Sequence, residues 1–244
     1  DLLQLAQARL GASLTAFELI SAICLDLVEK HVPTARRPLP EASPWYVLLE
    51  VSDMHDESHA AAAIEGLLEL ALERELATDA ALSESVAQFK ALWALREDIS
   101  ESQGAEGKTI KHDISLPISR IAEFVQSTAE SVEAAFPDVR LVVFGHLGDG
   151  NLHYNLSPAS GTGGDHAFVA LEGPINRLVH DAVAAFGGSI SAEHGLGVLR
   201  RDEAARYKSP VEVALMRSIK TALDPRNLMN PGKLLAAPAD TPSP

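Results

Sequence analysis

The sequence predicts an α+β fold in which helices pack on an antiparallel sheet, followed by a helical C-terminal segment. Two observations lead to this fold class. The expected elements run strand, helix, helix and extended segment, then helix, strand and strand, which is close to a doubled split βαβ plan. The last two strands are separated only by the glycine-rich turn 145–150, after which the chain returns along the sheet.

Each element has its own signal in the sequence. Apolar residues at three- to four-residue spacing predict a helix over 2–31 that stops near Pro33. The prolines within 36–44 indicate a linker, and the aromatic and aliphatic run 45–51 indicates a strand. The remaining expected elements are helices at 58–76, 83–102, 117–136, 167–186 and 210–223, an extended segment at 108–116, strands at 141–144 and 151–156, a polar loop at 157–165 and a disordered tail at 236–244.

Composition limits the function. The 244 residues carry a net charge of −14, which disfavours nucleic acid and anionic membrane surfaces as partners, because both bind basic surfaces. No apolar run reaches the roughly 18 residues that a membrane span requires, and no dinucleotide-binding or Walker A glycine motif occurs. The single cysteine, Cys24, lies in an apolar stretch, so we expect a buried thiol and a reducing, cytoplasmic location. Because the first residue is Asp1 and not Met, we expect a processed protein or part of a longer one.

Two histidines and a glutamate form the first group of candidate functional residues. His146 and His153 bracket the glycine-rich turn, so the two strands would bring both imidazoles to one end of the sheet. Glu193, followed by His194, lies between glycines after a short expected strand. Two histidines and one carboxylate leave open positions on a divalent metal, as catalysis requires. A hydrogen-bonded turn explains the histidines without a metal, and Asp149 is better explained as a turn former than as a ligand.

A second group combines two cationic side chains and a hydroxyl. Arg96 and Ser100 are four residues apart on an expected helix and would share one face. Lys111, on the extended segment, would complete a carboxylate site, because arginine offers a planar fork, serine a neutral donor and lysine a point charge. A solvated helix face with a surface pair such as Arg96–Glu97 explains the spacing at least as well.

Three segments resemble the C-terminal region of FAD-linked oxidases of the vanillyl-alcohol-oxidase superfamily. They are GHLGDGNLHYN (145–155), SISAEHGLG (189–197) and LDPRNLMNPGKLL (223–235), in the order typical of that family. LREDIS (95–100) and KHDISLP (111–117) are similar to the group that oxidises D-2-hydroxyglutarate. The resemblance implies a ferredoxin-like substrate domain, with an antiparallel sheet flanked by helices.

The resemblance implies a metal-assisted oxidation. His146, His153 and Glu193 would hold a divalent metal, usually zinc, which would chelate the C1 carboxylate and 2-hydroxyl of a small anionic 2-hydroxyacid. His194 would be the catalytic base that takes the hydroxyl proton. The C2 hydride would pass to the flavin to give 2-oxoglutarate, and the electrons would leave to electron-transfer flavoprotein or another acceptor.

The resemblance also assigns substrate- and cofactor-binding residues. Asn155 would contact the substrate, and Asn230 and Lys233 would approach the flavin ring, although NPGK is also a good turn after a helix. Ser100 stands where threonine is common, which keeps the hydroxyl. The residues that would hold the distal carboxylate are Arg96, Ser100 and Lys111.

A domain plan follows from the same resemblance. Residues 1–44 would be a helical lead-in from an N-terminal FAD-binding domain, 45–186 the α+β domain for substrate and metal, 187–235 a C-terminal segment and 236–244 a tail. The domain that holds most of the FAD in this family has no counterpart in the sequence. We therefore expect the chain alone to fold and to bind metal weakly, but neither to retain FAD nor to turn over. A homodimer is compatible with the family.

Three other functions stay open at this point. A D-lactate- or glycolate-oxidising flavoenzyme would leave Arg96, Ser100 and Lys111 idle, and D-malate is a further candidate substrate. A free-standing metallohydrolase would use His146, His153 and Glu193 without a flavin. A non-catalytic module would dock on a flavoprotein partner and would not need the histidines.

Overall fold

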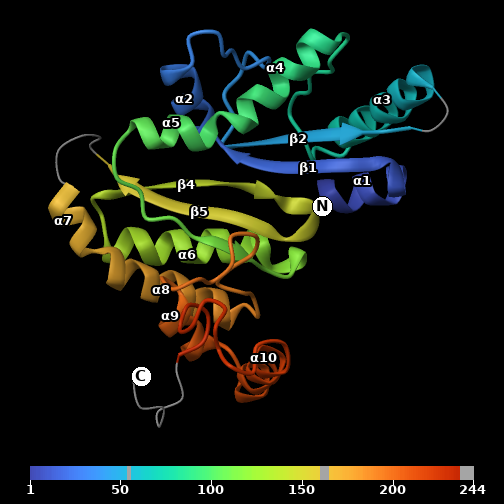
Figure 1. Cartoon of the computed structure of the whole chain (residues 1–244). Coiled ribbons are helices and arrows are strands. Elements are labelled where there is room, and N and C mark those ends of the chain that lie inside the picture. The colour runs from blue at the N-terminus through green and yellow to red at the C-terminus, as the bar shows by residue number, and fades with distance from the viewer. Residues whose placement is uncertain (54–55, 160–164, 237–244) are drawn as a thin grey trace.

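One antiparallel sheet organises the molecule (Figure 1). The computed structural model describes residues 1–53, 56–159 and 165–236, and within them five strands lie in the order β2–β1–β4–β5–β3. All neighbouring strands run antiparallel, so the predicted α+β class is confirmed. The strands are β1 (Leu14–Ser21), β2 (Trp45–Val51), β3 (Asp113–Ser115), β4 (Val139–His146) and β5 (Asn151–Pro158).

Helices cover both faces of this sheet. One face packs against α2 (Ala22–His31), α4 (Val86–Glu97) and α5 (Ile99–Ala105). The other face packs against α1 (Leu2–Leu10), α3 (Glu57–Glu73), α6 (Ile121–Ala135) and α8 (Glu172–Ala185). Of three more helices, α7 (Asp165–Ala170) packs against α8, whereas α9 (Arg201–Tyr207) and α10 (Pro210–Leu223) lie further from the sheet on the same side as α8 (Figure 1).

Side chains of β4 alternate between the two faces of the sheet, so this strand contributes to the hydrophobic core on each face. Val142 and Phe144 are buried against the α2, α4 and α5 side, whereas Val143 is buried with α6 and α8. Successive side chains of a strand point to opposite faces, and each fully buried aliphatic or aromatic side chain contributes roughly 1.5–3 kcal/mol. The side chain of His146, two residues after Phe144, therefore lies on the face that α4 covers.

The expected helix over 2–31 is wrong in its middle. Gly11, with φ +54°, ends α1, and β1 follows between β2 and β4. Because β1 is buried on both faces, apolar side chains such as Phe17 and Ile20 occupy both sets of alternating positions and hide the strand period. The expected helical lead-in 1–44 therefore contains an inner strand of the sheet, and the other expected domain bounds stay predictions.

Other expected elements differ at their ends. The helix 83–102 is divided at Asp98, a residue type that favours helix caps over helix interiors. The helix 167–186 is divided at Leu171, just before Pro174, which fits the first turn of α8. The short helix α9 was not expected, because its seven residues are too few to show a period.

Cys24 is fully buried, as expected, and burial raises the pKa of its thiol to about 12. None of the helices in the described ranges is both long and apolar enough to cross a membrane. Residues 160–164 of the expected polar loop, and the expected tail apart from Ala236, lie outside the described residues.

His112 makes the stability of the fold depend on pH. It is 1% exposed, its Nδ1 lies 2.8 Å from the carbonyl oxygen of Tyr154, and burial, followed by the charge of His180, lowers its pKa from 6.5 to about 3. The unfolded chain binds a proton near pH 6.5 that the folded chain does not bind until about pH 3. The free energy of unfolding therefore falls as the pH decreases through this window, by about 1.4 kcal/mol per pH unit for one proton.

We expect His112→Asn to reduce this dependence, because the amide keeps a donor for the carbonyl of Tyr154 and does not titrate. Urea unfolding at several pH values between 6 and 4 measures the slope for both proteins. A variant whose unfolding free energy falls as steeply as that of the wild type would contradict the assignment. His180 contributes in the same direction in both proteins, because burial lowers its pKa too.

Candidate metal centre

β4 and β5 place the two histidines of the candidate centre. His146 is the last residue of β4, and His153 lies on β5 directly opposite Phe144. Opposite residues of an antiparallel pair point to the same face, so both imidazoles lie on the face that α4 covers. Their ring centroids are 6.3 Å apart.

The turn between the strands depends on Gly150 and Asp149. Gly150 has φ +82°, and a Cβ there would lie 2.3 Å from the carbonyl oxygen of Leu116, so no other residue fits. Asp149 Oδ1 accepts the backbone N–H of Asn151 at 3.1 Å. This bond to the second residue along the chain is that of an Asx turn, which confirms the expected turn-forming role of Asp149.

Glu193, the third candidate ligand, lies on a loop whose start is hydrogen-bonded to β3. The backbone groups of Ser189 and Ser115 exchange hydrogen bonds of 2.8 and 3.0 Å. Gly188 permits this approach, because a Cβ there would lie 2.4 Å from the carbonyl oxygen of Ser115. The loop then crosses the edge of the sheet and carries Glu193 to the face where the histidines lie.

Asp113 anchors this loop from β3. Its Oδ2 accepts the backbone N–H groups of Ala192 at 3.3 Å, Glu193 at 2.9 Å and His194 at 2.8 Å. Hydrogen bonds to a carboxylate are stronger than neutral ones, and Asp113 is only 9% exposed. This role of Asp113 was not predicted, although the residue lies inside the KHDISLP segment that carries part of the resemblance.

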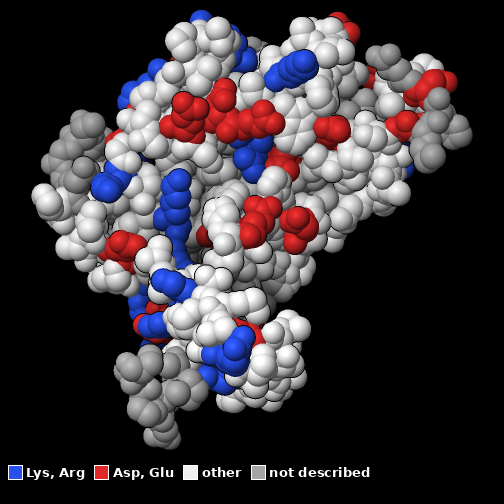
Figure 2. All heavy atoms as spheres, viewed as in Figure 1, with Lys and Arg blue, Asp and Glu red and all other residues white. Residues whose placement is uncertain are grey.

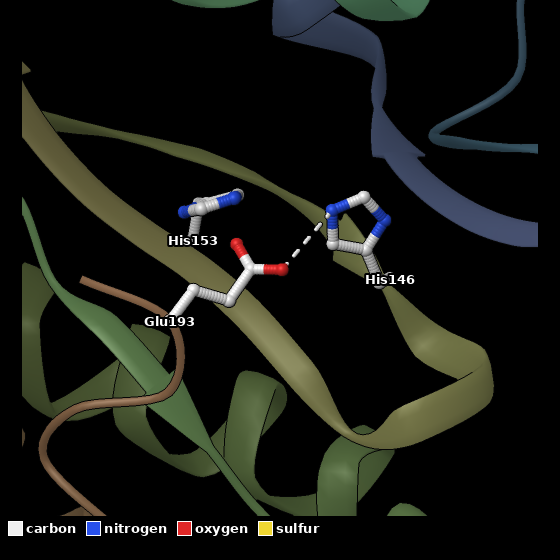
Figure 3. A group of neighbouring side chains, drawn as sticks. All are labelled: His146, His153 and Glu193. Carbon is white, nitrogen blue, oxygen red and sulfur yellow. Dashed lines mark ion pairs between the residues drawn. The ribbon is translucent and has the colours of Figure 1, made fainter. Parts of the chain in front are cut away.

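The structure brings the three expected metal ligands together (Figure 3). One ligand atom each from His146, His153 and Glu193 lies within 4.8 Å of the other two. The Nε2 atom of His146 is 3.6 Å from Oε1 of Glu193. Figure 3 shows the side chains converging from two strands and the loop, as a three-ligand site for a divalent cation requires.

The state of the two histidines suits metal binding. His146 Nδ1 lies 2.7 Å from Oε1 of Glu18. The carboxylate can accept a hydrogen bond from Nδ1–H of the ring, which leaves Nε2 free to bind the metal. Burial, followed by the positive charge of Arg96, lowers the pKa of His153. Lowering this pKa favours the neutral imidazole, which is the form that binds metals.

His194 lies next to this group. Its side chain is 66% exposed, and its ring stacks on that of His153 with centroids 5.9 Å apart. Nδ1 of His194 is 3.7 Å from Oδ2 of Asp113. The expected base is therefore accessible, next to the expected ligands, and close to a carboxylate that can stabilise positive charge on the ring.

Two cavities flank the loop. The first, of roughly 560 Å³, is lined among others by Glu18, Trp93, His146 and Glu193. The second, of roughly 460 Å³, is lined mainly by the loop itself, together with four charged or titratable residues. These four residues are Lys111, Asp113, His194 and Arg200.

Positive charge is concentrated locally despite the net charge of −14. Figure 2 shows acidic side chains gathered near α4 and α5, and basic ones gathered lower, near α9 and α10. Arg200 was not predicted, and its Nη2 donates to the backbone oxygen of Lys111 at 2.7 Å. The two cations share the cavity that His194 lines, so an anion there would meet both.

The other expected site residues are less closely grouped. Arg96 is 8% exposed and donates its Nε to Glu18 at 2.8 Å. The break at Asp98 separates it from Ser100, which is exposed on α5. Asn155 is buried, where its amide donates to Gln103 and accepts from the backbone of His112.

The two residues expected at the flavin lie in the turn after α10. Asn230 and Lys233 are both exposed, and the backbone N–H of Lys233 donates to the carbonyl oxygen of Asn230 at 3.2 Å. Asp224 organises the preceding turn by accepting the N–H groups of Leu228 and Met229. The roles of Asn230 and Lys233 stay predictions.

Asp113→Ala should loosen the loop without removing a ligand. Three charge-assisted backbone bonds are lost, and Glu193 and His194 lose their fixed positions. Because partners that orient metal ligands are worth about 10–100-fold in metal affinity, we expect a decrease of that size for Zn²⁺. Competition with a chelator measures it, and hydrogen exchange of the 192–194 amides reports the loop. Unchanged affinity with fast-exchanging amides would contradict the prediction.

Comparison with known proteins identifies the family of this chain. The family model for the C-terminal domain of FAD linked oxidases matches residues 2–234. This chain belongs to that family. The resemblance noted in the segments 145–155, 189–197 and 223–235 is thereby confirmed at the level of the family.

Relatives of this FAD-linked oxidase domain include D-2-hydroxyglutarate dehydrogenases. The mitochondrial enzyme of Arabidopsis thaliana is 37% identical over 231 residues, which are 94% of this chain and 39% of that protein. The enzyme of Xanthomonas citri pv. viticola is 39% identical over 242 residues, which are 98% of this chain and 50% of that protein. The chain thus spans two fifths to one half of these relatives, and the expected cytoplasmic location stays a prediction.

A solved structure supports the fold. The 4-ethylphenol oxidase from Gulosibacter chungangensis, in its isoeugenol complex, superposes with a TM-score of 0.57 over 97% of this chain and 51% of that chain. Sequence identity is 16%, so this likeness concerns the fold alone.

Proposed function

We propose that this chain is the substrate- and metal-binding part of an FAD-dependent D-2-hydroxyacid dehydrogenase that oxidises D-2-hydroxyglutarate to 2-oxoglutarate. The observation that carries the proposal is the convergence of His146, His153 and Glu193 within 4.8 Å, with His194 stacked beside them. The names of the relatives at 37% and 39% identity support the substrate.

The residues of the centre would divide the chemistry among them. When bound, a divalent ion, with zinc as the first candidate, supplies a Lewis acid that lowers the pKa of a coordinated hydroxyl, and FAD supplies the hydride acceptor. His146, His153 and Glu193 would hold the ion, which would bring its positive charge to the C1 carboxylate and the 2-hydroxyl of the substrate. His194 would accept the hydroxyl proton, and Asp113 would stabilise the resulting positive charge.

The distal carboxylate of the substrate would be held by positive charge. Arg96 donates its Nε–H to Glu18. A guanidinium has five N–H donors, so the others are available for a substrate carboxylate. Lys111 and Arg200 line the cavity beside His194. We include Arg200 in the proposed set of Arg96, Ser100, Lys111 and Asn155, because it shares that cavity.

FAD itself would be bound mostly by residues outside this sequence. Asn230 and Lys233, exposed in the turn after α10, would approach the flavin ring from this half. Electron-transfer flavoprotein, or another acceptor, would then reoxidise the flavin, and a homodimer remains a proposed assembly.

One observation favours a second candidate. Arg96 is held by Glu18, and Ser100 is exposed beyond the break at Asp98. A site in which these two residues do not bind substrate would accept a 2-hydroxyacid without a distal carboxylate. D-lactate or glycolate oxidation is therefore the alternative.

Turnover in a longer protein tests the proposal. With this chain joined to a flavin-binding half, we expect D-2-hydroxyglutarate to be oxidised with a higher kcat/KM than D-lactate or D-malate. A chelator should remove the activity, and Zn²⁺ should restore it. Chelator-resistant turnover would contradict the metal, whereas a preference for D-lactate would support the alternative.

A further inference from the structure

Glu18 connects the two halves of the candidate site. It lies on β1 opposite His146 of β4 and is 2% exposed. Its Oε1 lies 2.7 Å from Nδ1 of His146, and its Oε2 accepts Nε of Arg96 at 2.8 Å. One buried carboxylate thus touches both an expected metal ligand and an expected substrate-binding cation.

We propose that Glu18 is a positioning residue that sets both the metal-binding form of His146 and the place of Arg96. The inference rests on the proposed metal centre and extends it to a residue of β1. In it, Glu18 acts through these two neighbours and does not itself bind the metal or the substrate.

The tautomer of His146 is the first link. A carboxylate only accepts hydrogen bonds, so Glu18 requires the proton of the neutral ring to be on Nδ1. The lone pair then lies on Nε2, the atom that is 3.6 Å from Glu193. A carboxylate behind a ligating histidine also raises its basicity and fixes its ring.

The position of Arg96 is the second link. Its guanidinium lies over the ring of Phe144, 4.8 Å from the centroid, while Nε is held by Glu18. Phe144 is also the residue opposite His153, and the two rings lie 4.7 Å apart. The cation is therefore fixed against the same strand pair that carries the histidines, and its positive charge is balanced by Glu18.

The variant Glu18→Gln tests whether Glu18 acts through its hydrogen bonds or only fills space. The side chain keeps its size, and its amide oxygen can still accept from Arg96, the charged donor. The amide NH₂ then faces Nδ1 of His146 and favours the tautomer with the proton on Nε2, which blocks the metal-binding atom. We expect the Zn²⁺ affinity of the chain, measured by competition with a chelator, to fall by about 10–100-fold.

Two further variants complete the comparison. Glu18→Asp keeps the acceptor and should recover part of the Zn²⁺ affinity. Glu106→Gln is the matched control, because Glu106 is 7% exposed and pairs with Lys30, His31 and Arg140 away from the centre. This control should lose stability and keep wild-type Zn²⁺ affinity.

The substrate side gives an independent readout. In the flavin-containing protein, Glu18→Gln should raise KM for D-2-hydroxyglutarate by a larger factor than KM for D-lactate, which has no distal carboxylate for Arg96 to meet. A purely structural role of Glu18 would change both values by the same factor.

Clear outcomes would overturn the inference. If the wild type binds Zn²⁺ and folded Glu18→Gln binds it within about threefold as tightly, Glu18 does not position His146. If the variant does not fold, the ¹⁵N chemical shifts of His146 in the metal-free wild type decide, since a proton on Nε2 would overturn the inference. A wild type that binds no Zn²⁺ would instead contradict the proposed function.

Discussion

His153→Ala should remove metal binding and lower kcat/KM for D-2-hydroxyglutarate by roughly 10³-fold. The ligand set falls from three side chains to two, and a Lewis acid at the reacting oxygen is worth several kcal/mol, where each 1.36 kcal/mol is a factor of ten. The fold should survive, because the ring mainly packs on Phe144 with centroids 4.7 Å apart. Zn²⁺ titration of the chain and steady-state kinetics of the flavin-containing protein measure the two effects.

His31→Ala provides the control for this variant. His31 lies on α2 and pairs with Glu106, away from the candidate centre. It should leave Zn²⁺ affinity and kcat/KM at wild-type values. A His153→Ala protein that still binds one equivalent of Zn²⁺ with wild-type affinity would show that the three side chains converge for another reason.

Arg96→Leu should lower the free energy of unfolding by about 3–5 kcal/mol, because breaking a buried ion pair leaves an uncompensated charge. The charge concerned is that of Glu18, whose side chain is 3% exposed. Urea unfolding measures the loss. As a control, Arg206→Leu removes an arginine paired with Asp181 across 3.6 Å, with both side chains about half exposed. Such exposed pairs are worth about 0–1 kcal/mol.

The double variant Arg96→Leu with Glu18→Gln tests the cause. Removing both charges should recover part of the stability, so the two effects should differ from additivity by more than about 1 kcal/mol. Additive losses would contradict a buried pair. This coupling also means that reduced turnover after loss of Arg96 would not by itself demonstrate substrate binding, and Lys111→Ala, at an exposed residue, is the better test of the distal carboxylate.

Local signals were sufficient to predict the hairpin and its histidines. The glycine-rich turn and the strands on either side lie within twenty consecutive residues, so the sequence alone placed His146 and His153 at the same end of the sheet. Their common face follows from the strand register, in which Phe144 lies opposite His153. Strand β1 was not predicted, because it is buried on both faces and its apolar residues imitate a helical period. Whether such a segment is a helix or a strand is decided by its neighbours β2 and β4.

The supporting residues of the site could not be found from spacing. Glu18 and His146 are 128 residues apart in sequence, and Asp113 and His194 are 81 apart. Such pairs are fixed by strand register and loop attachment, which a single sequence does not show. The resemblance identified the residues that converge, His146, His153, Glu193 and His194. It did not show that Arg96 is balanced by Glu18, or that Ser100 is separated from Arg96 at Asp98.

Strand β1 lies between β2 and β4 and joins them into one sheet. A version that started at residue 45 would strip away the strand between β2 and β4. Strand β2 would then lose its only neighbour in the described sheet. Strand β4 would become an edge strand with unpaired N–H and C=O groups, which promotes aggregation. Any shortened version of the chain must therefore keep residues 14–21 together with the histidines.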